Sequence, residues 1–158
     1  MASPPAPLAY HPGMPEPLAL TGPTRAFIAA PGRFATLATL APDGAPRQAV
    51  VWYRLDPDGM LVINSAEGRH WPANLRRDAR VAIAIADPSD GYHWVGLDAE
   101  VAEIVDDQAI AQADIADLAH RYYPDDPAEV AAGIARFQTQ RRVTFRLRST
   151  SFHDHLDR

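Results

Sequence analysis

The chain has 158 residues, and 47% of them are apolar, which is enough for one globular domain with a full hydrophobic core. Its formal net charge of -5 argues against a nucleic-acid-binding protein, because such proteins neutralise phosphates with Lys and Arg. It has no cysteine, which excludes disulfides, thiolate metal sites and thiol nucleophiles and is compatible with a reducing compartment. Since the sequence shows neither a signal peptide nor a bilayer-spanning apolar run, we expect a cytoplasmic protein without membrane or nucleic-acid partners.

Residues 1–22 predict an arm in front of the folded domain. They contain six prolines, which remove backbone donors and fix φ. Such a segment is either flexible or lies across a partner subunit. Order is expected to begin near Thr21, because Pro23 suits the first turn of a short helix that ends at Pro31 and Gly32. The predicted division is an arm over residues 1–22 and one domain over residues 23–158.

Alternating apolar residues and turn sequences predict an antiparallel meander after this helix. Pro42-Asp43-Gly44 and Asp56-Pro57-Asp58-Gly59 are typical turn sequences. They separate predicted strands over residues 34–40, 48–53 and 60–65.

Three later strands complete the predicted sheet. Residues 81–86 are apolar at every position, which is typical of a central strand covered on both faces. Residues 92–105 predict one long strand. Residues 142–148 alternate between apolar side chains and arginine or threonine, which predicts a half-exposed last strand.

Two helices are predicted between the last two strands. The first has an apolar stripe at positions 115, 118, 119 and 122 behind an acidic start, and the second begins at a capping box with Asp126 as its cap and Glu129 three residues later. Asp114 and Asp117 belong to the predicted solvated face of the first helix, and no function is assigned to them. The whole pattern predicts a mainly β fold, a barrel of six antiparallel strands with two or three short helices, because closure removes exposed strand edges.

The segment SAEGRHWPANLRRDAR, residues 65–80, is the predicted seat of function. A strand ends here, the chain passes through Gly68, and a helix starts near residue 70, where exposed backbone amides favour anions. Arg69 adds a charge-assisted donor and Trp71 a stacking surface. Asn74 offers an amide to the loop backbone or to a ligand.

Other polar residues carry weaker signals. Arg76, Arg77 and Arg80 lie near the end of the same helix, where cations are frequently structural. His153 and His155 lack a third ligand in a recognised spacing, so no metal site is predicted. Dinucleotide, phosphate-loop, hydrolase and zinc-protease motifs are also absent from the sequence.

Three stretches together resemble a known family: FATLATLAPDGAPRQAVVWY, LVINSAEGR and NLRRDARVAIAIADPSDGYHWVGLDAEVAEI. Their order and spacing are similar to the pyridoxamine 5'-phosphate oxidase-like split-barrel superfamily, in its flavin and deazaflavin oxidoreductase branch. The resemblance covers most of residues 33–149. It implies a homodimeric split β-barrel that binds coenzyme F420 or FMN at the subunit interface and transfers a hydride.

The resemblance also implies a set of cofactor-binding residues. The second strand would line the ring, the end of the third strand would meet the ring and the ribityl chain, Gly68 and Arg69 would lie beside the phosphate, and Tyr92 would come from the other chain. Trp71 and Asn74 complete the set from the segment above. The full set is Ala49, Val50, Val51, Trp52, Asn64, Ser65, Ala66, Gly68, Arg69, Trp71, Asn74 and Tyr92.

The chain departs from the family pattern at two places. Relatives that bind coenzyme F420 commonly have a lysine and an arginine where this chain has Trp71 and Ala73, and Ala49-Val50 replaces a frequent Ser-Pro pair. Either other cations such as Arg69, Arg76 or Arg47 hold the cofactor, or the chain uses FMN, or it has changed ligand.

The predicted function is therefore an F420-dependent reductase of small, electron-poor or conjugated substrates. The alternatives are an FMN-dependent oxidoreductase and a non-catalytic protein that binds a flavin, haem or a lipophilic molecule. The reduced cofactor carries the hydride, so no nucleophile is needed, and Tyr53, Tyr92 and His93 are candidate proton donors. The strands around Val51 and Ile83 are expected to supply an apolar dimer contact.

Overall fold

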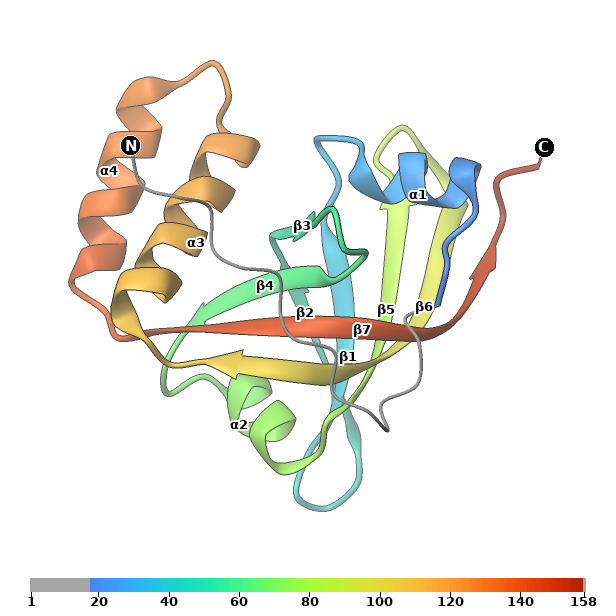
Figure 1. Ribbon diagram of the computed structural model, residues 1–158, viewed down its shortest axis with the longest axis horizontal. Helices are drawn as coiled ribbons and strands as arrows, with labels where there is room; N and C mark the ends of the chain where they lie inside the picture. Colours follow the sequence, from blue (N-terminus) through green and yellow to red (C-terminus); the bar gives the residue numbers. More distant parts are fainter. Residues whose placement is uncertain (1–17, 158) are drawn as a thin grey trace.

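The computed structural model describes residues 18–157, so most of the predicted arm and Arg158 lie outside the described residues. This part of the chain folds as a strongly curled antiparallel sheet with four helices around it (Figure 1). In chain order the elements are α1 (Gly22–Ala29), β1 (Ala35–Leu40), β2 (Pro46–Val51), β3 (Tyr53–Leu55), β4 (Leu61–Ala66), α2 (His70–Arg77), β5 (Arg80–Asp87), β6 (Asp90–Val105), α3 (Gln108–Tyr122), α4 (Pro127–Gln138) and β7 (Arg142–Asp154).

The sheet has seven strands in the order β2-β1-β5-β6-β7-β4-β3, one more than the six predicted. β2 and β3 form its two edges, yet only Trp52 separates them in the chain. The sheet must therefore curl until its edges come together at this residue. Among residues 18–157 no ladder joins β2 to β3 or β4, so the barrel is split along this line.

The predicted strand over residues 48–53 is thus two strands, and Tyr122 explains the break. The backbone N–H of Tyr53 donates to the Tyr122 hydroxyl at 3.1 Å, and that hydroxyl donates to the Arg33 carbonyl at 2.6 Å. The Trp52 ring stacks on the Tyr122 ring, with centroids 5.0 Å apart and planes 8° apart. A side chain from α3 therefore holds the junction between the edges.

The helices begin where their local signals place them. Thr21, Asp107 and Asp126 cap α1, α3 and α4 by accepting backbone N–H bonds, which confirms the expected starts of these helices. α3 and α4 form a helical hairpin at one end of the sheet, α1 covers the opposite end, and α2 crosses below (Figure 1). No helix in residues 18–157 has the length and apolar character needed to cross a membrane.

Burial corrects three predictions. β5 is an internal strand, but it is covered on one face only, because Ala82, Ala84 and Ala86 are exposed while their neighbours are buried. The first half of β7 is buried on both faces, not half-exposed, because α3 packs on its outer side. Asp114 is not solvated: it accepts from Arg54 at 2.7 Å and from Thr144 at 2.8 Å, whereas Asp117 is exposed as predicted.

Candidate functional site

A cleft of about 250 Å³ lies at the split in the barrel. We call it the split cleft. β2 and Trp52 form one side of it, β4 and the start of α2 form its floor, and the helical hairpin with the start of β7 forms the far wall. The lining residues are Val50, Val51, Trp52, Asn64, Arg69, Trp71, Ile115, Arg136, Phe137, Gln140 and Arg142.

The charge of the split cleft is entirely positive. Arg69, Arg136 and Arg142 line it, and no carboxylate is among its lining residues. The guanidinium groups of Arg69 and Arg136 make no hydrogen bond or ion pair with any residue between 18 and 157. Cations gathered in a concave, partly dry site favour an anionic ligand.

Arg142 is the buried member of this group, with 4% of its surface exposed. Its Nε donates to the Asn64 Oδ1 at 2.9 Å and its Nη1 donates to the Gln140 Oε1 at 2.6 Å. Burial first, and the charge of Arg69 second, lower the pKa of Arg142 to about 10. Because both hydrogen-bond partners are neutral, its charge is not compensated by the described residues.

Asn64 fixes the position of Arg142. Its amide nitrogen donates to the Ala111 carbonyl and to the Thr144 hydroxyl, both at 2.9 Å, and its amide oxygen accepts from Arg142. Asn64 was predicted to meet the cofactor itself. The structure places it in the cleft floor with its amide hydrogen bonds used by the protein, so it orients a guanidinium.

Two glutamines one turn apart on α3 hold the far wall. Gln108 accepts from the Arg142 backbone N–H at 2.9 Å and donates to its carbonyl at 2.8 Å. Gln112 donates to the carbonyls of Phe137 and Gln140 at 3.0 and 2.9 Å. The turn between α4 and β7 is therefore pinned on both sides of Gln140.

The corner at Gly68 and Arg69 has the features of an anion site. Gly68 has a φ of +89°, a conformation that favours glycine, and nothing lies within 4 Å of the place where a Cβ would stand. α2 starts directly after Arg69 with no side chain capping its first amides. Backbone donors at the start of a helix beside an arginine suit a phosphate or carboxylate.

Aromatic side chains give the split cleft its apolar surface. Trp52 is held by Tyr122 on one ring face, and Phe137 meets it edge-on, with centroids 6.3 Å apart. Trp71 packs on Phe145, with centroids 5.6 Å apart, and is nearly buried. The combination of aromatic surface and guanidinium groups suits a planar molecule that carries an anionic group.

Half of the predicted cofactor residues line the cleft: Val50, Val51, Trp52, Asn64, Arg69 and Trp71. Ala49, Ser65, Ala66 and Gly68 lie within two residues of a lining residue in the chain without lining the cleft themselves. Asn74 is buried elsewhere, where it donates to Thr39 at 3.0 Å and accepts from Arg77 at 3.1 Å. Tyr92 lies on the exposed start of β6, away from the cleft of its own chain.

The candidate proton donors do not line the cleft. Tyr53 is fully buried and donates to the Ile28 carbonyl at 2.8 Å, and burial raises its pKa. His93 packs edge-on against Phe27, with centroids 5.1 Å apart. None of Tyr53, Tyr92 and His93 is among the residues that line the split cleft.

Two of the cations proposed to replace the lysine and arginine of F420-binding relatives, Arg76 and Arg47, do not line the split cleft. Arg76 pairs with Glu67 and Asp106, both at 2.5 Å, and Arg47 is an exposed edge residue bonded to the Pro46 carbonyl. Arg77 and Arg80 are engaged with Asn74 and Asp78, which agrees with the structural interpretation given to them. The cations that do join Arg69 in the cleft are Arg136 and Arg142, which sequence reasoning missed along with Ile115, Phe137 and Gln140.

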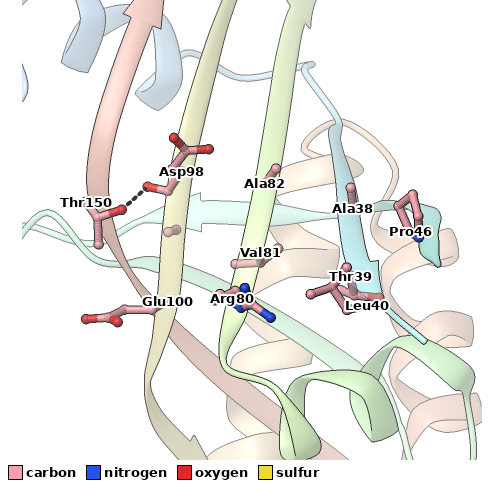
Figure 2. A pocket seen from close by; sticks show the side chains of 11 residues that line it. Ala38, Thr39, Leu40, Pro46, Arg80, Val81, Ala82, Asp98, Glu100 and Thr150 are labelled. Atoms are coloured by element: carbon pink, nitrogen blue, oxygen red, sulfur yellow. Dashed lines mark hydrogen bonds between the residues drawn. The ribbon is translucent and has the colours of Figure 1, made fainter. Parts of the chain in front are cut away.

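A second hollow, the outer groove, has a volume of about 440 Å³ and is lined by residues of β1, β2, β5, β6 and β7. Figure 2 shows Ala38 and Ala82 on neighbouring strands, with Arg80 and Glu100 toward one end and Asp98 and Thr150 across β6 and β7. The Thr150 hydroxyl donates to the Asp98 carbonyl at 3.2 Å. The groove is lined by small apolar side chains together with charges of both signs. It does not have the three arginines that line the split cleft.

Comparison with known proteins agrees with this architecture. The sequence pattern described as pyridoxamine 5'-phosphate oxidase matches residues 20–146, so the chain belongs to that family, as the resemblance indicated. No curated protein matches the chain.

Three solved structures illustrate the range of similar proteins. An F420 reductase is 26% identical with a TM-score of 0.65, over 82% of this chain and 94% of that one. A conserved hypothetical protein from Mycobacterium tuberculosis is 25% identical with a TM-score of 0.67, over 89% and 88%. A heme binding protein from Mycobacterium smegmatis is 28% identical with a TM-score of 0.56, over 85% of this chain and 54% of that one.

Proposed function

We propose that the protein is an oxidoreductase that binds a deazaflavin or flavin in the split cleft, with coenzyme F420 as the first candidate and FMN as the alternative. The observation that carries this proposal is the cleft itself: three arginines and aromatic side chains face one hollow without a carboxylate, at the corner where the family resemblance puts the phosphate. Similarity to an F420 reductase favours the deazaflavin.

The residues of the cleft fit such a cofactor. Arg69 and the first amides of α2 would hold the phosphate, and Val50, Val51 and Trp52 would lie along the ring system. The bound cofactor would supply the hydride for an electron-poor substrate. The protein would orient the two molecules and exclude water, with Trp52 fixed for this purpose by Tyr122.

We also propose that the functional unit is a homodimer in which a second copy completes the site. Ligand pockets are usually about 300–1,000 Å³, so a cleft of about 250 Å³ would hold only part of a flavin-sized molecule. Val51 and Ile83 themselves are buried in the core, but Val50, Ala82 and Ala84 on the outer sides of the same strands are exposed and would supply the apolar contact expected of these strands. The outer groove is lined by Arg80, Asp98 and Glu100, and these charges of both signs would suit a second copy.

Native mass spectrometry followed by titration tests this function. We expect a dimer that binds coenzyme F420 with a change in its fluorescence and that catalyses oxidation of reduced F420 by an electron-poor alkene. Tight binding of FMN with no binding of F420 would shift the assignment to the flavin. A monomer that binds neither cofactor would refute the proposal.

Haem binding is the second candidate, and its support is the similarity to the heme binding protein. No histidine is among the residues that line the split cleft, so the usual axial ligand is missing there. A Soret band in the isolated protein would favour haem over the flavin cofactors.

A further inference from the structure

We propose that the far wall of the split cleft is a separate oxyanion subsite, formed by Arg136, Gln140 and Arg142, which binds a carboxylate or phosphate group of a small molecule. This inference deepens the proposed function and rests on it for the identity of the small molecule. The group belongs either to the cofactor or to an acidic substrate, and the experiment below separates these sources.

The first support is a buried guanidinium with donor capacity to spare. Arg142 uses Nε and Nη1 for Asn64 and Gln140, while Nη2 donates to no residue between 18 and 157. The side chain is more than nine-tenths buried and lines the cleft. A guanidinium held in this way is preorganised for the planar, charge-assisted bonds that carboxylates and phosphates accept.

The second support is convergence of two cations on one aromatic ring. The guanidinium carbons of Arg136 and Arg142 lie 5.3 and 5.0 Å from the centroid of the Phe137 ring. Both groups therefore lie close to Phe137, at the same wall of the cleft. The charge of Arg69 also acts on Arg142, and an anion bound among these like charges would reduce their repulsion.

The third support is rigidity. Gln108 and Gln112 hold the carbonyls of Phe137, Gln140 and Arg142, so the wall does not depend on a mobile loop. Asn64, which itself donates to Thr144, fixes the guanidinium from the floor. A site that is built before the ligand arrives loses little conformational entropy on binding.

The test is calorimetric titration of the purified full-length protein with benzoate and with inorganic phosphate at low ionic strength. We expect saturable binding that Arg136→Gln weakens by about fivefold or more, as loss of one charge-assisted contact predicts. Arg141→Gln is the matched control, because Arg141 is an exposed neighbour that carries the same charge and does not line the cleft. We expect it to change the affinity by less than about twofold.

Arg142→Gln is expected to abolish binding of benzoate and phosphate. Circular dichroism checks that this variant folds. If Arg142→Gln is unstable, Arg136→Gln still tests the subsite. Repeating the titration with saturating FMN or F420 separates the sources: competition assigns the oxyanion to the cofactor, and unchanged affinity assigns it to a second, acidic molecule.

Absence of saturable binding, or equal effects of Arg136→Gln and Arg141→Gln, would overturn the subsite. Benzoate binding without any cofactor binding would instead refute the proposed function and leave the subsite standing.

Discussion

The Arg142 Nε donates a 2.9 Å hydrogen bond to the Asn64 Oδ1 and so joins the start of β7 to β4 across the floor of the split cleft. The Asn64 amide nitrogen donates to the Ala111 carbonyl and to the Thr144 hydroxyl. One neutral amide thus links a helix, two strands and the buried cation of the candidate site.

Replacing Asn64 with leucine is expected to lower the free energy of unfolding by about 1–3 kcal/mol, because the substitution leaves the Arg142 Nε without a partner in a buried place. Urea denaturation measures the loss. Gln48→Leu, on the exposed edge strand β2, serves as a control. Equal stability of the two variants would show that the Asn64 bonds contribute nothing net.

Asp114 and Asp117 provide a second matched pair on α3. Asp114→Asn removes the partner of Arg54 and weakens the bond from Thr144, and we expect a loss of about 1–3 kcal/mol, below the value for a fully buried pair. Asp117 is exposed, so Asp117→Asn is expected to stay within about 0.5 kcal/mol of the wild type in thermal or urea unfolding. Similar losses in both variants would contradict the burial of Asp114.

Because the Tyr53 phenol is buried, we expect the free energy of unfolding to fall at alkaline pH. Burial raises the pKa of its phenol above the ordinary value, and interaction with Tyr122 raises it further. The folded state therefore keeps a proton that the unfolded state loses above about pH 10, so stability is full below that pH and declines as pH rises, by up to about 1.4 kcal/mol per pH unit.

The difference between wild type and Tyr53→Phe isolates this effect, because the chain has no lysine and the other four tyrosines are present in both proteins. Urea unfolding at pH 8 and at a pH near 11 is the measurement. We expect the wild type to lose more stability than the variant over this interval. Parallel curves for the two proteins would refute the assignment.

Gly68→Ala tests the corner that precedes α2. A non-glycine residue at a φ of +89° is strained, so we expect a loss of about 1 kcal/mol in stability, although no atom would collide with the new methyl group. The expected functional effect is weaker binding of FMN or F420, because the first amides of α2 would move. Gly44→Ala, in the β1–β2 turn at a φ of +82°, should cost similar stability and leave cofactor affinity unchanged.

The fold was largely predictable where the signals are local. Turn sequences and helix caps place α1, α3, α4 and the strand reversals, because capping and turn formation depend on residues a few positions apart. The break at Trp52 was not predictable, since it depends on the hydroxyl of Tyr122, which lies 69 residues from Tyr53 in the chain. Asp114 was misassigned for the same reason, because its partner Arg54 lies 60 residues away.

One part of the candidate site was predictable from local sequence, and the other part was not. The corner at Gly68 and Arg69 is marked by its own sequence, because glycine and a following helix start are adjacent. The far wall is not, because Arg142 reaches Asn64 across 78 residues, and its neighbour Arg141 has the same side chain but is exposed. Only the pairing of β7 with β4 decides which of the two arginines enters the cleft.

The most direct test of the central claim is a fluorescence titration of coenzyme F420 and FMN against the wild type, Arg69→Gln and Arg47→Gln. We predict that one of the two cofactors binds the wild type, that Arg69→Gln lowers its affinity by about tenfold, and that Arg47→Gln, on the exposed edge strand, leaves it unchanged. Binding of neither cofactor, or equal affinity for the wild type and Arg69→Gln, would contradict the assignment of the split cleft as a redox-cofactor site.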